Sequence, residues 1–166
     1  MKLLIDGYNL LGRSGGMSRD IEEERETLLS RLCLYQRKKK TDITVVFDGW
    51  DRGLPIEQGG RHGTVSVIFS KQGEKADLVI KRRIESASGT KGVVVSSDHE
   101  ITRFAESHGW SVVESSAFDA KLWDVFYEAE YGKVDDDDDE RQASKKGNPR
   151  RLSKAARKKQ GILKKL

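Results

Sequence analysis

Three short, largely apolar segments of this sequence each end at an aspartate. Residues 2–5 run into Asp6, residues 43–47 run into Asp48, and residues 93–97 run into Asp98. If these segments are parallel strands, their carboxyl ends meet at one edge of a sheet, which is where open α/β folds place their ligands. Clustered carboxylates repel one another and bind hard cations through oxygen. The pattern therefore predicts metal-assisted chemistry on phosphate at this edge.

Strands and helices alternate along most of the chain. Short apolar segments predict five strands, at 2–5, 43–47, 64–69, 92–96 and 110–113. Helical periodicity predicts helices at 20–38, 74–87 and 117–130 and a short one after Asp98. This alternation favours an α/β fold with a mostly parallel sheet of about five strands, covered by helices on both faces. The glycine-rich residues 10–19 and 48–63 are expected to be loops, and a loop as long as the second is often functional.

The distribution of charge divides the chain into a near-neutral domain, residues 1–132, and a charged tail, residues 133–166. Residues 135–140 are six consecutive acids, whereas residues 141–166 contain eleven Lys and Arg and no acid. The tail is too polar to fold alone, so we expect it to be disordered when free. Its cations would draw the protein to nucleic acid through phosphate contacts. A tail that serves only solubility is the competing interpretation.

Several classes of protein are excluded or disfavoured. The single Cys33 excludes an internal disulfide and fits a reducing cytoplasm. No apolar run approaches the ~20 residues needed to cross a bilayer, so we expect a cytoplasmic protein without membrane contact. The sequence contains no Cys/His zinc spacing, no Walker A motif, no GxGxxG and no serine nucleophile elbow.

The acids at the predicted edge also have ordinary structural explanations. Asp6 and Asp48 each precede a glycine, as turn residues do, and Asp98 suits the N-cap of a helix. Glu74 and Asp77 suit a first helical turn, where the helix dipole favours negative charge. The occurrence of such acids in four separate segments favours a functional cluster over four coincidences.

The predicted loop 48–63 carries side chains suited to nucleic acid. Arg52 and Arg61 can hold phosphates, and Trp50 and His62 can stack on unpaired bases. A solvated glycine-rich loop explains the same residues equally well.

Four motifs in this sequence resemble the NYN domain family, in its YacP-like branch, which belongs with the PIN-like nucleases. They are residues 4–9 (LIDGYN), 45–49 (VVFDG), 69–77 (FSKQGEKAD) and 94–98 (VVSSD), and they follow one another in the family's order within residues 1–130. The resemblance implies a three-layer PIN-like α/β fold and metal-dependent cleavage of RNA. It also implies that Asp6, Asp48, Asp77 and Asp98 hold Mg²⁺ or Mn²⁺, with Asn9 and Glu74 assisting. Some YacP-like proteins act on mRNA at the ribosome, which makes both expected partners.

We therefore expect a metal-dependent endoribonuclease that cleaves single-stranded RNA. Asp6, Asp77 and Asp98 would bind the cation, Asp48 and Glu74 would complete the site or orient water, and Asn9 would hold the scissile phosphate or a ligand carboxylate. The expected RNA contacts are Trp50, Arg52, Arg61, His62, Arg150, Arg151, Arg157, Lys158 and Lys159.

Two other functions are compatible with parts of the sequence. A non-catalytic RNA- or ribosome-binding module would act through the basic tail. A small-molecule phosphatase is less favoured, because Asp6 is followed by Gly7 and Tyr8 and not by an Asp-x-Asp pair. The sequence predicts no oligomeric state.

Overall fold

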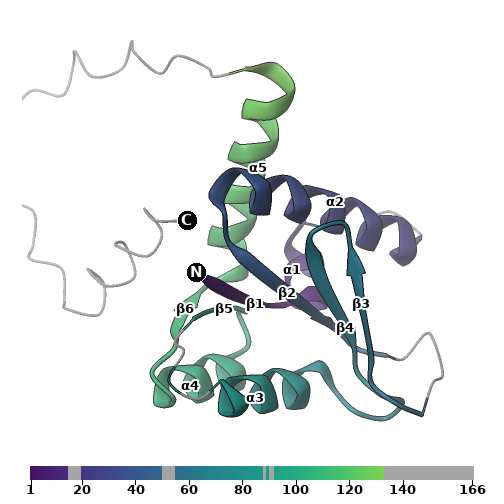
Figure 1. Ribbon diagram of the computed structural model, residues 1–166, viewed down its shortest axis with the longest axis vertical. Helices are drawn as coiled ribbons and strands as arrows, with labels where there is room; N and C mark the ends of the chain where they lie inside the picture. Colours follow the sequence, from purple (N-terminus) through teal and green to yellow (C-terminus); the bar gives the residue numbers. More distant parts are fainter. Residues whose placement is uncertain (15–19, 50–54, 88, 90–91, 133–166) are drawn as a thin grey trace, which may run out of the picture.

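The computed structural model describes residues 1–14, 20–49, 55–87, 89 and 92–132, which form a sheet between two layers of helices (Figure 1). Helices α3 and α4 lie on one side of the sheet, and α1, α2 and α5 lie on the other. The three-layer α/β fold expected from the sequence is confirmed. The elements are β1 (Lys2–Asp6), α1 (Gly7–Ser14), α2 (Ile21–Lys39), β2 (Asp42–Phe47), β3 (Gln58–His62), β4 (Val65–Phe69), α3 (Ala76–Ser86), β5 (Val93–Val95), α4 (His99–Ser107), β6 (Ser111–Val113) and α5 (Ser115–Tyr131).

The sheet has the strand order β3-β4-β2-β1-β5-β6. Every neighbouring pair is parallel except β3 and β4, which are antiparallel. The five predicted strands are therefore present, and β1 lies between β2 and β5. This order brings the carboxyl ends of β1, β2 and β5 side by side.

The sixth strand, β3, corrects the prediction of a continuous loop over residues 48–63. Its sequence, QGGRH, has no apolar residue. An edge strand that is largely exposed, as β3 is, needs no apolar face. It is held instead by backbone pairing with the apolar strand β4. A pattern search for hydrophobic alternation cannot detect such a strand.

Alternate residues of the central strands build two separate cores. Leu3, Ile5, Val45 and Phe47 belong to the cluster under α1, α2 and α5. Leu4, Val46, Ile68 and Val94 belong to the cluster under α3 and α4. The strands are continuous apolar runs because both faces of the sheet are buried, as is usual for a parallel sheet.

Helix α1 corrects part of the loop predicted over residues 10–19, since residues 10–14 belong to this helix. Residues 15–19 of that loop lie outside the described residues. The helix starts directly after β1, at Gly7. A Cβ at Gly7 would lie 2.3 Å from the ring of Phe47, which is fully buried. Glycine is thus required by close packing of α1 on β2, and no turn is needed.

The helix starts predicted at Asp20 and Asp98 are confirmed. Helix α3 begins at Ala76 and not at residue 74, so Glu74 lies before the first turn in which it was expected, and α5 begins at Ser115 and not at residue 117. Asp20 accepts hydrogen bonds from the backbone N–H groups of Glu22 and Glu23 and begins α2, and Asp98 does the same for α4 through Glu100 and Ile101. Within the described ranges, no helix has both the length and the apolar character that a bilayer crossing requires. The tail, residues 133–166, and the loop residues 50–54 lie outside those ranges.

The two glycines of α1 offer a matched test of this packing. We expect Gly7→Ala to destabilise the fold by about 1–3 kcal/mol, because a methyl group cannot be fitted against Phe47 without displacing it. Gly12→Ala should be neutral or stabilising by about 0.5–1 kcal/mol, because nothing lies within 4 Å of a Cβ there. Urea unfolding of both variants measures the difference, and equal effects would contradict the close contact.

Candidate active site

Three aspartates meet at the carboxyl edge of the sheet. Asp6 is the last residue of β1, Asp48 follows β2, and Asp98 lies three residues after β5. Because β1 is central among these strands, Asp6 is flanked by the other two segments. The structure thus brings together the three acids that end the apolar segments of the sequence.

Asp6 is half-buried, and its pKa is raised to about 6. Burial is the largest cause, and the negative charges of Asp48 and Asp98 raise the pKa further. Hydrogen bonds from the Asn9 backbone N–H, at 3.2 Å, and from the Ser96 hydroxyl, at 3.3 Å, oppose this effect. The three carboxylates are therefore close enough to repel one another.

Each of these aspartates also accepts backbone N–H groups at the start of a helix. Asp6 accepts from Asn9 in α1, and Asp98 accepts from Glu100, at 2.7 Å, and Ile101 in α4. Asp48 accepts from the backbone N–H of Ala76, the first residue of α3. These acids therefore interact with helix N-termini and also lie together at one edge, so the structural and the clustered interpretations of the sequence are compatible.

Ser96 joins two of the carboxylates. This serine is fully buried, and its hydroxyl donates to Asp6 Oδ2 and accepts a hydrogen bond from the Asp98 backbone N–H at 3.0 Å. The position of Asp98 is thereby tied to that of Asp6 through a single side chain. Ser96 lies within the motif VVSSD, but its hydrogen bonds to Asp6 and Asp98 form only in the fold and were not predicted from the sequence.

Asn9 holds the segment that follows β5. Its Oδ1 accepts hydrogen bonds from the Ser97 backbone N–H, at 2.9 Å, and from the Ser115 hydroxyl, at 2.6 Å. Within the described residues its side-chain amide N–H group makes no hydrogen bond. Ser115, which is fully buried at the start of α5, was missed by sequence reasoning. A serine that opens a helix is common, and no local signal marks its long-range partner.

Gly49 brings the end of β2 close to the end of β4. A Cβ at Gly49 would lie 1.8 Å from the carbonyl oxygen of Ser70, so only glycine fits. The Gly49 backbone N–H donates to the Ser70 hydroxyl at 3.0 Å, and that hydroxyl donates to the Glu74 carbonyl. This contact places Asp48 over the start of α3.

Glu74 and Asp77 differ in their surroundings. The Glu74 carboxylate is buried and forms an ion pair with Arg82, which lowers the pKa of Glu74 through a side-chain hydrogen bond. Asp77 is half-buried in the first turn of α3. Its neighbour is Lys81, whose pKa is raised first by a hydrogen bond to Glu100 and further by the charges of Glu100, Asp77 and Asp98.

Of the residues predicted to contact RNA, the structure describes two, and neither lies at this edge. Arg61 and His62 lie in β3, and His62 Nδ1 is 3.3 Å from the carboxylate of Glu26 in α2. The other seven lie outside the described residues: Trp50, Arg52, Arg150, Arg151, Arg157, Lys158 and Lys159.

The donor groups at this edge are carboxylate oxygens, which are the ligands of Mg²⁺ and Mn²⁺. Among the described residues, no three His, Cys, Asp or Glu side chains are arranged as a preformed metal-binding group. Magnesium is usually held by one or two carboxylates together with water and substrate phosphate. The repelling Asp6, Asp48 and Asp98 carboxylates fit that kind of site, because a cation would relieve their repulsion.

Comparisons with known proteins identify what this arrangement is similar to. The model of the YacP-like NYN domain matches residues 3–164, so the match continues beyond residue 132. The uncharacterized protein YacP of Bacillus subtilis (strain 168) is 27% identical over 135 residues, which are 77% of this chain and 74% of YacP.

Crystal structures of Rae1 (YacP) from Bacillus subtilis have the same fold. One of them has a TM-score of 0.63 and 24% identity and covers 78% of this chain and 78% of its own. A mutant of the same protein has the same TM-score and identity and covers 75% of this chain and 76% of its own.

The raised pKa of Asp6 makes stability depend on pH. The unfolded pKa is about 3.9, so the folded state binds the proton more tightly and loses stability as pH rises from about 4 to about 6. Asp6→Asn removes the charge and keeps an acceptor oxygen. In EDTA we expect Asp6→Asn to be more stable than the wild type by up to about 2–3 kcal/mol near pH 7.5, and by much less near pH 4.5.

Urea unfolding at the two pH values measures this difference, and Asp124→Asn, at an exposed acid of α5, is the control. The control should show no such change between the two pH values. An Asp6→Asn effect of equal size at both would show that the ionised Asp6 carboxylate is not destabilising.

Proposed function

The chain belongs to the YacP-like NYN domain family, a family of PIN-like nucleases, and from this premise we propose that it is a metal-dependent endoribonuclease acting on single-stranded RNA. The observation that carries the proposal is the half-buried Asp6, with its raised pKa and with Asp48 and Asp98 close enough to repel it. Such an arrangement lowers the stability of the fold when no cation is present. A role in phosphodiester cleavage would explain why these mutually repelling carboxylates are placed together despite their cost in stability.

In this proposal Asp6, Asp48, Asp77 and Asp98 hold Mg²⁺ or Mn²⁺. A cation bound there would polarise the phosphoryl oxygen and lower the pKa of water. Asp6 is the central ligand, since it lies between the other two strand ends and is fixed by Ser96 and by the Asn9 backbone. The helix N-termini under Asp6, Asp48 and Asp98 keep these carboxylates aimed at the edge before any ligand arrives.

Two further side chains have proposed roles at the substrate. Asn9 would use its side-chain amide N–H to hold a phosphate oxygen, because its Oδ1 is already engaged by Ser97 and Ser115. Glu74 would act indirectly, because Arg82 holds its carboxylate. Lys81 would balance the charge of Asp77 and Asp98 when the site is empty.

Attack by water on an RNA phosphodiester needs little else from the protein. The carboxylates would orient the water and accept its proton as its oxygen bonds to phosphorus. The bond from phosphorus to the leaving ribose oxygen would break, and that oxygen would take a proton from solvent. The strand would be held by contacts to its phosphates and bases. The proposed partners are single-stranded RNA, including mRNA, and the ribosome.

A second candidate is a non-catalytic module that binds RNA or ribosomes. The eleven Lys and Arg without an acid in residues 141–166 favour it, since such a segment binds phosphate strongly at low salt. In that case the carboxylate edge would have no catalytic role.

We expect purified protein to cleave a labelled single-stranded RNA in Mn²⁺ or Mg²⁺ and not in EDTA. Asp6→Asn and Asp98→Asn should each lower the rate by about 100-fold or more, because they remove ligand charge. Asn caps a helix as well as Asp does, so Asp98→Asn should leave α4 intact. Asp124→Asn, on the exposed face of α5, should cleave at the wild-type rate.

Circular dichroism of each variant separates lost catalysis from lost folding. Cleavage that persists in EDTA, or that survives in both site variants at full rate, would contradict the metal assignment. Absence of cleavage in every metal, with and without ribosomes, together with salt-sensitive RNA binding, would instead favour the binding module.

Deletion of residues 141–166 distinguishes the two candidates. A nuclease should retain cleavage of naked RNA, with weaker binding and a smaller dependence on salt, because phosphate contacts of the tail are lost. A binding module should lose its function with the tail. Cleavage rate and RNA affinity of the truncated protein, measured at several salt concentrations, give the answer.

A further inference from the structure

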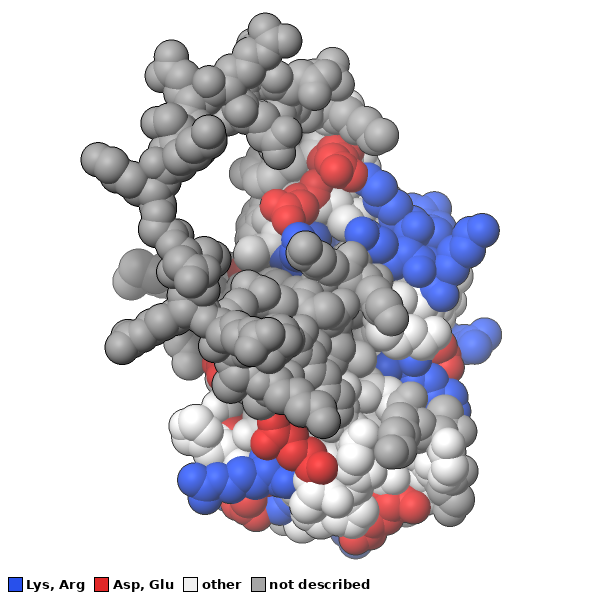
Figure 2. Space-filling view, turned by 90° about the vertical axis from the view of Figure 1, so that its left-hand side faces the viewer, with Lys and Arg blue, Asp and Glu red and all other residues white. Residues whose placement is uncertain are grey.

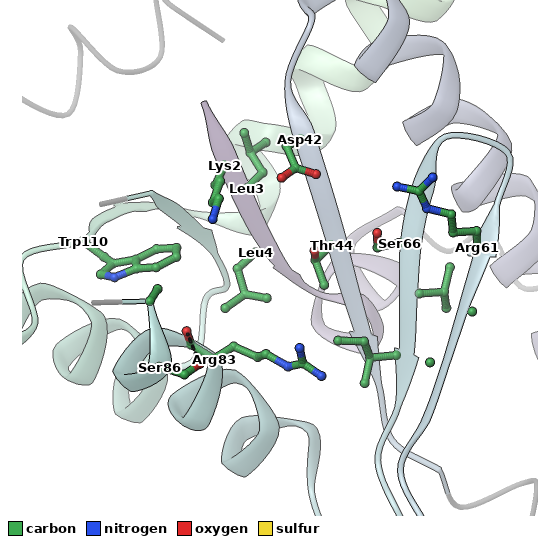
Figure 3. Close-up of a pocket in the computed structure, with 15 residues that line it drawn as sticks. Lys2, Leu3, Leu4, Asp42, Thr44, Arg61, Ser66, Arg83, Ser86 and Trp110 are labelled. Atoms are coloured by element: carbon green, nitrogen blue, oxygen red, sulfur yellow. Dashed lines mark hydrogen bonds between the residues drawn. The ribbon is translucent and has the colours of Figure 1, made fainter. Parts of the chain in front are cut away.

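The sheet has an open hollow on the side of α3, at the ends of the strands opposite to the carboxylates (Figure 3). Its volume is about 680 Å³, which lies within the ~300–1,000 Å³ range of pockets for small molecules. Its floor is formed by β1, β2, β4 and β3, one wall is the C-terminal half of α3, and Trp110 closes one end.

The floor becomes polar where the helical cover ends. Leu4, Thr44, Ser66 and Arg61 are paired across four neighbouring strands and so form one row on this face of the sheet. The same face is apolar further along, at Val46 and Ile68, where α3 packs on it. Two hydroxyls and a guanidinium thus lie where a covered sheet would present apolar side chains.

Cations surround this polar floor. Lys2 and Arg61 are exposed, and in the part of the chain that the structure describes neither is paired with an acid. Arg83 extends from α3 into the hollow (Figure 3), and Glu57, which does not line the hollow, lies 2.7 Å from its guanidinium. Three cations and one acid, Asp42, therefore line the hollow, and the charge of one of these cations, Arg83, is balanced by Glu57. The hollow is suited to an anion with additional hydrogen-bonding groups.

The surroundings add to this positive charge. Helix α2 ends in four consecutive exposed bases, Arg37, Lys38, Lys39 and Lys40. The chain enters the hollow two residues later, at Asp42. Figure 2 shows the basic side chains gathered over this flank of the molecule. Acids lie among these bases, since Glu128 pairs with Lys38 and Asp42 is exposed at the entrance to the hollow.

This region is distinct from the carboxylate edge. Lys2 and Asp6 are at opposite ends of β1, about 13 Å apart at the usual rise of a strand. Arg83 and Ser86 are in the C-terminal half of α3, whereas Asp77 is in its first turn. A ligand in the hollow would not touch the aspartates.

We propose that the hollow binds a nucleoside phosphate unit of an RNA strand. Lys2, Arg61 and Arg83 would hold the phosphates, and Thr44, Ser66 and Asp42 would accept or donate hydrogen bonds at the ribose and base. This inference rests on the proposed function, because it takes RNA as the ligand, and it adds a binding site on the far end of the sheet. A free nucleotide has the same chemistry and is distinguished by the experiment.

Two neighbouring glycines of β3 provide a matched pair of variants. Gly59 pairs with Ile68, whose side chain faces α3, whereas Gly60 pairs with Val67, whose side chain faces α2. A Cβ on either glycine meets nothing within 4 Å. Gly59→Leu therefore fills the hollow without strain, and Gly60→Leu places the same side chain on the opposite face.

The experiment measures binding of a fluorescent single-stranded RNA of about 20 nucleotides in EDTA, and AMP is the competitor. We expect Gly59→Leu and Arg61→Ala each to weaken RNA binding by about fivefold or more, since the first fills the hollow and the second removes a phosphate contact. Gly60→Leu should bind as the wild type does. AMP should compete only weakly, because a strand makes more phosphate contacts than one nucleotide.

Three results would overturn the proposal. If Gly59→Leu and Gly60→Leu bind RNA equally while the wild type cleaves it in Mn²⁺, the hollow is not an RNA site and the nuclease stands. If AMP binds tightly and only Gly59→Leu abolishes this, the ligand is a free nucleotide. If the wild type neither binds nor cleaves RNA, the proposed function fails together with this inference. Thermal unfolding of each variant confirms that it is folded.

Discussion

The architecture depends on placing negative charge at helix N-termini. Asp6, Asp48 and Asp98 each accept backbone N–H groups that begin α1, α3 and α4, so each carboxylate completes a helix whose first amides lack partners. The same bonds fix the side chains at the edge where β1, β2 and β5 end. Without these donors, three acids in so small a volume would be costly, and the fold would have reason to separate them.

Two groups of serine and glycine contacts complete this arrangement. Ser96 couples Asp6 to Asp98, and Gly49 lets β2 approach the end of β4 so that Asp48 reaches α3. These contacts connect segments up to 90 residues apart in sequence. The fold itself therefore fixes the positions of these carboxylates, as the catalysis proposed for this edge requires.

Strong, local patterns made the main elements predictable. Apolar runs and a cap such as Asp98 predicted the strands and α4, and the order of strands placed the three acids near one another. The predictions for two elements, β3 and α1, were wrong because these elements depend on contacts with residues distant in sequence. The strand β3 has no apolar residue and exists through pairing with β4, and α1 follows Gly7 because of packing on Phe47. The partners of Ser115 and Glu74 could not be predicted from the sequence either, because these contacts form only in the folded chain.

Glu57 is shared by two adjacent arginines, and this has a mechanical consequence. Its carboxylate lies 2.8 Å from Arg82, which also holds Glu74, and 2.7 Å from Arg83, which enters the hollow. An anion that drew Arg83 away would leave Glu57 to Arg82 alone and so redistribute the charge around Glu74. Glu57 and Arg82 thus connect the hollow at the C-terminal half of α3 with Glu74 at its N-terminal end. If anion binding in the hollow changes ligand affinity at the carboxylate edge, thermodynamic linkage requires that a ligand at the edge change anion affinity in the hollow by the same factor.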